Sequence, residues 1–160
     1  MTARTVRTMI AFAILVVLHY TVRPLMAWRA APDFMVLALL LAAVRLRPGT
    51  GAILGFVMGL TVDSVSLGPL GGAALAMGVV GFTASWLKSV VFADDLRLNA
   101  FFFFVGKLAF DVLYIPFQRH GGGAEVVILL MWSLLAALLT AIVGVVVLVM
   151  LRPILEPSPA

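Results

Sequence analysis

Five ionisable side chains interrupt the apolar stretches of this 160-residue chain, and they are its main candidates for chemistry. His19 and Arg23 are four residues apart. Lys107 and Asp111 have the same spacing, so the members of each pair share one face of a helix. Asp63 lies in a third apolar stretch. Ionisable residues in such stretches usually face the interior of a helix bundle, where they pair or line a polar path. We therefore predict an internal polar cluster drawn from these five residues.

Two interpretations of this cluster stay open: it could conduct a proton or small solute, or it could fix the register of the helices through ion pairs. We favour the second, because a transporter would normally carry more such residues. Catalysis has no candidate constellation. The chain has no cysteine, its two histidines (His19 and His120) lie far apart, and it contains no phosphate loop, HExxH motif or nucleophile elbow. We expect no enzyme, metal site or cofactor.

The composition sets the class of protein. Hydrophobic residues make up 64% of the chain and charged residues only 11%, whereas soluble domains contain about 25% charged residues. The mean hydropathy is +1.20. The net charge of +4 comes from basic residues scattered between apolar runs, which is typical of membrane anchors and not of a nucleic-acid surface. The chain is therefore predicted to be an all-α, polytopic integral membrane protein.

A membrane-spanning helix needs about 20 mostly apolar residues. We identify six candidate spans: 9–28, 31–44, 51–65, 70–92, 98–117 and 126–151. The second and third are too short to span comfortably as straight helices, and their limits are the least defined. We expect one transmembrane domain, residues 1–160, in which about six helices form one bundle between short terminal tails. An uncleaved first span and a disordered tail at 156–160 are also expected.

The distribution of basic residues predicts the topology, because Lys and Arg in short loops favour the cytoplasmic side. Six spans with both termini in the cytoplasm place seven basic residues on the inner side: Arg4, Arg7, Arg45, Arg47, Lys88, Arg97 and Arg152. The outer side then has Arg23, Arg29 and Arg119. An alternative in which 31–65 forms a hairpin dipping in from outside would bury Arg45 and Arg47, at about 2.5–3.5 kcal/mol each. That alternative is weaker.

Small residues recur at helical spacing on two neighbouring stretches. One stripe consists of Gly51, Gly55 and Gly59, and Asp63 continues it after four more residues. The other stripe is formed by Gly71, Ala74, Gly78, Gly81 and Ser85. Within lipid, such faces let helix backbones approach closely. The stripes could serve only packing within the chain, or at least one of them could accept a helix of a partner protein.

A family resemblance rests on these same residues. The chain has Ala31, Pro32 and Asp33 before the second stretch, and Arg45 and Arg47 in the loop after it. The pattern then continues with two glycines four apart, an aspartate four further on and a Leu-Gly pair: Gly55, Gly59, Asp63, Leu70 and Gly71. In this pattern the chain resembles the bacterial rod shape-determining protein MreD family. The specific part covers residues 32–82; elsewhere the agreement is in length, hydropathy and number of spans.

The resemblance implies a non-catalytic scaffold of the cell-elongation machinery, which synthesises peptidoglycan, in the bacterial inner membrane. It implies binding to MreC through transmembrane helices, with a class B penicillin-binding transpeptidase, RodA and MreB as indirect partners. The family's arrangement is similar to that of the substrate-binding subunits of energy-coupling-factor transporters. A small-solute (vitamin-type) binding subunit is therefore the alternative, although the outer loops are short and poor in polar groups. Three questions stay open: which helix meets MreC, whether a lipid or small ligand occupies the bundle, and the oligomeric state.

Overall fold

The computed structural model describes residues 3–26, 31–66, 70–87, 95–118 and 123–155. For 3–9, 23–26, 124 and 151–155 it describes the backbone only. Within this part of the chain every regular element is a helix: α1 (Ala3–Met26), α2 (Phe34–Ala43), α3 (Pro48–Val65), α4 (Gly72–Trp86), α6 (Leu96–Tyr114), the 3-10 turn η1 (Ile115–Phe117) and α7 (Gly123–Leu155). The prediction of an all-α chain is confirmed for the described residues.

Three stretches of described helix are long and apolar enough to cross a membrane: Pro48–Val65, Leu96–Phe117 and Glu125–Met150. The apolar stretches Ile10–Val22, Phe34–Ala43 and Gly72–Trp86 are shorter. The fold is therefore that of a membrane protein, while length and composition alone identify three spans and not the predicted six. The fourth helix ends at Trp86 instead of residue 92, and 88–94 and the tail at 156–160 lie outside the described residues.

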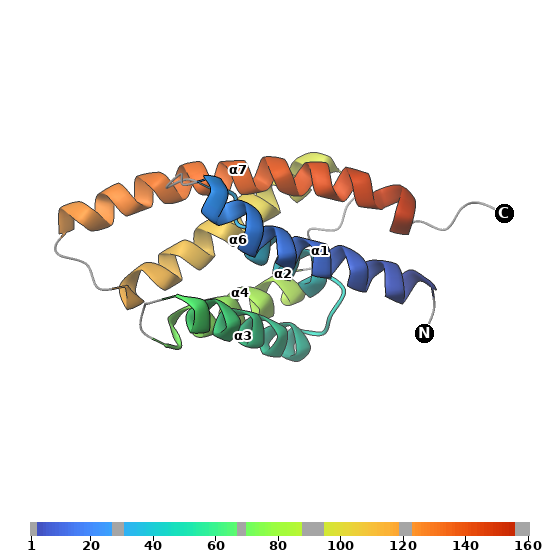
Figure 1. Ribbon diagram of the computed structural model, residues 1–160, viewed down its shortest axis with the longest axis horizontal. Coiled ribbons are helices and arrows are strands. Elements are labelled where there is room, and N and C mark those ends of the chain that lie inside the picture. Colours follow the sequence, from blue (N-terminus) through green and yellow to red (C-terminus); the bar gives the residue numbers. More distant parts are fainter. Residues whose placement is uncertain (1–2, 27–30, 67–69, 88–94, 119–122, 156–160) are drawn as a thin grey trace.

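The helices run back and forth along the long axis of the molecule (Figure 1). The start of α1, the turn at 44–47 and the end of α7 lie toward one end, on the right of that view. The helices α3 and α4 pack along each other, as do α6 and α7, and α1 packs mainly on α2. The arrangement brings Arg45 and Arg47 to the end of the molecule where α1 starts.

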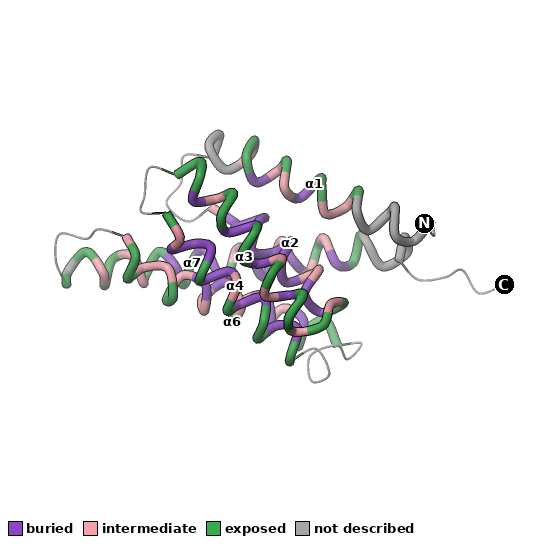
Figure 2. Tube along the Cα trace, turned by 90° about the horizontal axis from the view of Figure 1, so that it is seen from below, coloured by how far each residue is buried: buried purple, intermediate pink, exposed green. Residues whose placement is uncertain are grey.

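The short helix α2 forms the centre of the bundle. All of its residues from Phe34 to Leu40 are buried, and it contacts α1, α3, α4, α6 and α7. Figure 2 shows this concentration of buried residues around α2. With 10 residues, α2 is about 15 Å long, half the roughly 30 Å of a bilayer core. The helix is therefore too short to cross a bilayer, and its buried first turn lies inside the bundle.

Candidate functional site

Asp33 occupies the N-cap of α2 and is 3% exposed. Its Oδ1 accepts hydrogen bonds from the backbone N–H groups of Met35 and Val36, both at 3.2 Å. An aspartate at this position satisfies N–H groups that the helix itself leaves unpaired. The Asp33 backbone N–H donates to Thr140 Oγ1 at 3.0 Å, and that hydroxyl donates to the carbonyl of Ala136 at 2.7 Å. The start of α2 is thus attached to the middle of α7.

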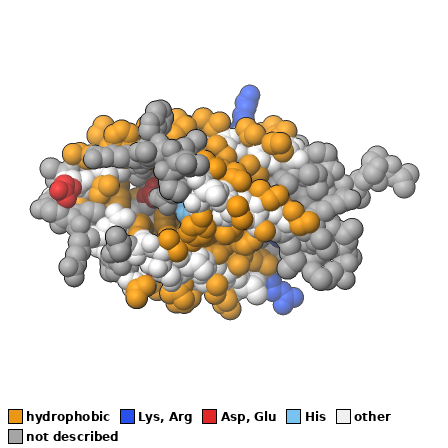
Figure 3. All heavy atoms as spheres, in the orientation of Figure 1, with side chains coloured by type: hydrophobic (Ala, Val, Ile, Leu, Met, Phe, Trp, Pro, Cys, Tyr) orange, Lys and Arg blue, Asp and Glu red, His pale blue; other side chains and the backbone are white. Residues whose placement is uncertain are grey.

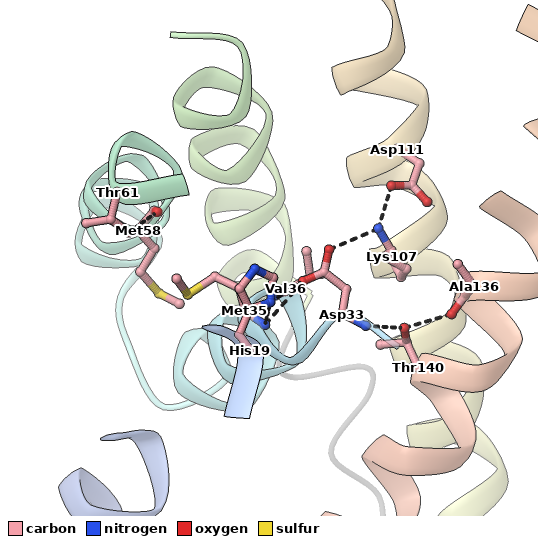
Figure 4. Close-up of polar contacts among 10 residues, drawn as sticks. All are labelled: His19, Asp33, Met35, Val36, Met58, Thr61, Lys107, Asp111, Ala136 and Thr140. Atoms are coloured by element: carbon pink, nitrogen blue, oxygen red, sulfur yellow. Dashed lines mark hydrogen bonds and ion pairs between the residues drawn. The ribbon is translucent and has the colours of Figure 1, made fainter. Parts of the chain in front are cut away.

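Lys107, in the middle of α6, joins two carboxylates (Figure 4). Its Nζ lies 3.1 Å from Asp33 Oδ2 and 2.5 Å from Asp111 Oδ1. Asp111 Oδ2 accepts a hydrogen bond of 2.6 Å from Ser133 Oγ on α7. The Lys107 side chain is only 6% exposed, and a buried charge of this kind is tolerated only when it is paired. We call Asp33, Lys107, Asp111 and Ser133 the polar network; it connects α2, α6 and α7.

His19 brings α1 to the same place. Its Nδ1 lies 3.3 Å from Asp33 Oδ1 and 3.3 Å from the backbone nitrogen of Met35. One nitrogen can donate to Asp33 or accept from Met35, but not both at once. Donation to Asp33 leaves the Met35 N–H paired, because that group has Asp33 Oδ1 as an acceptor as well. Of the five residues of the predicted cluster, the structure thus brings together His19, Lys107 and Asp111, while the Arg23 side chain lies outside the described part.

Asp63 does not join this network, in contrast to the predicted cluster. It is 2% exposed and accepts hydrogen bonds from the backbone N–H groups of Gly71, Ala73 and Ala74 at 3.0, 3.1 and 3.0 Å. Gly71 precedes α4 with φ of 101°, a backbone conformation that favours glycine. Asp63 therefore caps the start of α4, where a negative charge is also stabilised by the helix dipole. Leu70, next to this turn, is exposed.

The two small-residue stripes face each other. A Cβ atom added at Gly51, Gly55 or Gly59 would lie 2.6, 2.1 or 2.3 Å from the backbone carbonyl oxygens of Gly81, Met77 and Ala73, respectively. Gly78 is less crowded, with Ala52 O at 3.6 Å from such an atom. At the far end, Ser85 Oγ donates to the carbonyl of Ala43 at 2.8 Å. The glycines of α3 thus pack directly against the backbone of α4. The structure supports packing within the chain as the role of the stripes, and not docking of a partner helix.

A cavity of about 360 Å³ adjoins the polar network. Its buried end is formed by His19, Asp33 and Lys107, and Asp111 and Ser133 also line it. The apolar wall includes three aromatic side chains from α6 and α7: Phe110, Tyr114 and Trp132. Ser66, after α3, and Gln118, after η1, complete it near helix ends that the predicted topology places outside. Figure 3 shows acidic and histidine side chains at the bottom of a recess in a largely hydrophobic surface.

Three contributors to the site were missed in the sequence. Asp33 was assigned to the family pattern alone, and Ser133 and Thr140 were not singled out. The shortness of the second apolar stretch was the available signal for Asp33, because a helix too short to span must begin or end inside the bundle. Ser133 and Thr140 offered no such signal, since hydroxyl groups in an apolar helix often bond their own backbone.

Comparisons with known proteins give one match. The sequence model of a family described as rod shape-determining protein MreD matches residues 2–156. No curated protein and no solved structure matches the chain significantly. The match covers every described helix, including all residues of the polar network and the cavity.

Proposed function

Since the chain belongs to the rod shape-determining protein MreD family, we propose that it is a non-catalytic membrane scaffold of the cell-elongation machinery that binds MreC through contacts between transmembrane helices. Membership implies a role in rod shape determination and a general link to the MreBCD system. The finer proposal also places the chain in the inner membrane, with both termini in the cytoplasm, and connects it through MreC to a class B penicillin-binding transpeptidase, RodA and MreB. The observation that carries the proposal is the match over 2–156.

The surface available for such a contact is the outer face of the bundle. The glycine stripes are occupied, and in lipid the association of helices relies on close packing because lipid tails are as apolar as the side chains. Exposed ridges of large apolar side chains run along five helices: Ile10, Ile14 and Val17 on α1; Ile53, Phe56 and Leu60 on α3; Leu75, Val79 and Phe82 on α4; Phe101, Val105 and Val112 on α6; and Ile128, Leu135 and Ile142 on α7. We expect one of these ridges to pack against the single span of MreC.

The test uses the absence of native cysteine. Single cysteines along the five ridges are paired with cysteines along the MreC span and oxidised in membranes from a rod-shaped host. Cross-links should appear on one ridge at helical spacing. A cysteine at Ala137, which is fully buried, is the matched control and should form none. If MreC is retained but no ridge forms a cross-link, the contact is not within the membrane. If MreC is absent from the purified complex, MreC is not the partner.

The cavity favours a second candidate, the small-solute (vitamin-type) binding subunit of a transporter, because about 360 Å³ is within the range of small-molecule sites. The two candidates differ in what co-purifies and in what depletion does. MreC with wall synthases, and rounded cells on depletion, support the scaffold. A pair of ATPase subunits, and growth of depleted cells restored by added vitamin, support the transporter.

A further inference from the structure

The cavity beside the polar network is large enough to hold a small ligand. Its volume of about 360 Å³ would hold on the order of ten water molecules at 30 Å³ each. A recess of this size beside charged side chains is filled by water or by a ligand, because only apolar cavities stay empty. The chemistry of the lining decides which ligand it would accept.

Asp111 is the acid that the network presents to the cavity. Its side chain is 14% exposed, whereas those of Asp33 and Lys107 are 4% and 6% exposed. Each carboxylate oxygen can accept about two hydrogen bonds; Oδ1 accepts from Lys107 and Oδ2 from Ser133. Lys107 also shares its single positive charge between Asp111 and Asp33. Asp111 therefore offers a negative charge and further acceptor capacity to a donor in the cavity.

The wall beside Asp111 is aromatic. The rings of Phe110 and Tyr114 are stacked, with centroids 5.4 Å apart and planes inclined by 15°. The Lys107 ammonium already lies 4.9 Å from the Phe110 centroid, so this wall accepts an ammonium group over an aromatic face. Tyr114 and Trp132 extend the same lining. Aromatic faces combined with a carboxylate are the means by which proteins recognise organic ammonium ions.

We propose that this cavity binds a ligand bearing an ammonium group, with the ammonium held by Asp111 against Tyr114 and Trp132. Polar groups elsewhere in the ligand would meet Gln118 and Ser66. An anionic ligand would meet the carboxylate of Asp111, which is more exposed than the Lys107 ammonium, and a neutral ligand would gain nothing from that charge. The ammonium group can belong to a free amine or to a phosphatidylethanolamine headgroup. The inference goes beyond the scaffold function and does not depend on MreC.

The experiment uses the fluorescence of Trp132 in the full-length purified protein. Phe replaces Trp28 and Trp86, which leaves Trp132 as the single tryptophan. Choline and ethanolamine should change this fluorescence saturably, and the uncharged tert-butyl analogue of choline at the same concentration should not. Asp111→Asn should weaken amine binding about tenfold or more, because it removes the charged acceptor. Asp95→Asn, at an exposed N-cap on α6, is the matched control and should leave it unchanged.

A second measurement keeps Asp111 in place in case its substitution prevents folding. A single cysteine at Leu129, which lines the cavity and lies outside the polar network, should be protected from alkylation by choline or ethanolamine. Nanodiscs of defined lipid identify the source of the ammonium group. If the cysteine is protected in phosphatidylethanolamine nanodiscs and not in phosphatidylglycerol nanodiscs, the ligand is a lipid headgroup. If free amines protect it in both kinds of nanodisc, the ligand is soluble. Equal binding of the uncharged analogue, unchanged binding in Asp111→Asn, or no protection by any of these probes would overturn the proposal.

Discussion

Asp63→Ala should be among the most destabilising single substitutions in this protein. Its carboxylate accepts from three backbone N–H groups at the start of α4. Ala73 and Ala74 are fully buried, and each N–H left unsatisfied costs about 1–3 kcal/mol. The N–H of Gly71 is half-buried, so water or lipid headgroups can replace part of its bond. The loss in free energy of unfolding should thus be about 3–5 kcal/mol.

The matched control is Asp95→Ala. Asp95 caps α6, but it is exposed and its side chain accepts from one backbone N–H, that of Arg97 at 2.9 Å. Loss of an ordinary N-cap costs about 0.5–2 kcal/mol. Asp63→Asn keeps one side-chain oxygen, so its loss in free energy of unfolding should lie between those of Asp63→Ala and Asp95→Ala. Reversible unfolding of the full-length protein in detergent micelles, followed by circular dichroism, measures all three.

The result that would refute the reasoning is a loss in Asp63→Ala no larger than that in Asp95→Ala. A second outcome would show that Asp63 belongs to the predicted polar cluster after all. If Asp63 paired with Lys107, the two substitutions would be coupled, and Lys107→Met would reduce the effect of Asp63→Ala. A cap on α4 predicts additive losses, within about 0.5 kcal/mol.

Three further predictions follow from the packing and the topology. Gly55→Ala should destabilise the α3–α4 pair or prevent its assembly, because the added Cβ would lie 2.1 Å from a backbone oxygen. Gly49→Ala, with open space around it, should be tolerated. Equal stability of the two variants would contradict the close packing. Lys107→Met should cost about 3–5 kcal/mol and more than Asp111→Asn, since Lys107 joins two carboxylates. Adding Asp111→Asn to Lys107→Met should recover part of that loss, so additive losses would argue against the pairing. A cysteine at position 122 should react with an impermeant reagent in intact cells; reaction only after the inner face is opened would refute the predicted topology.

The class of fold and the approximate helices could be predicted from the sequence, because both depend on properties that are local in the chain. Apolar runs of membrane length can satisfy their backbone only as helices in lipid, so hydropathy determined the all-α membrane class. Helical periodicity also placed Asp63 on the face of Gly59, and Lys107 one turn from Asp111. The pattern from Pro32 to Gly71 was specific enough to indicate the family.

Only the tertiary structure decided which of these local features meet. The spacing of the glycines is the same whether a stripe faces a partner or its own neighbour, and the chain reversal between α3 and α4 is what sets the two stripes against each other. That reversal also brings the start of α4 to Asp63, which therefore became a helix cap and not a member of an ion pair. Asp33 reached Lys107, 74 positions away in the chain, because α2 is too short to span and begins inside the bundle. The cavity beside them is likewise a product of the tertiary structure, because its lining comes from segments far apart in the chain, among them His19, Asp63's neighbour Val62 and Trp132.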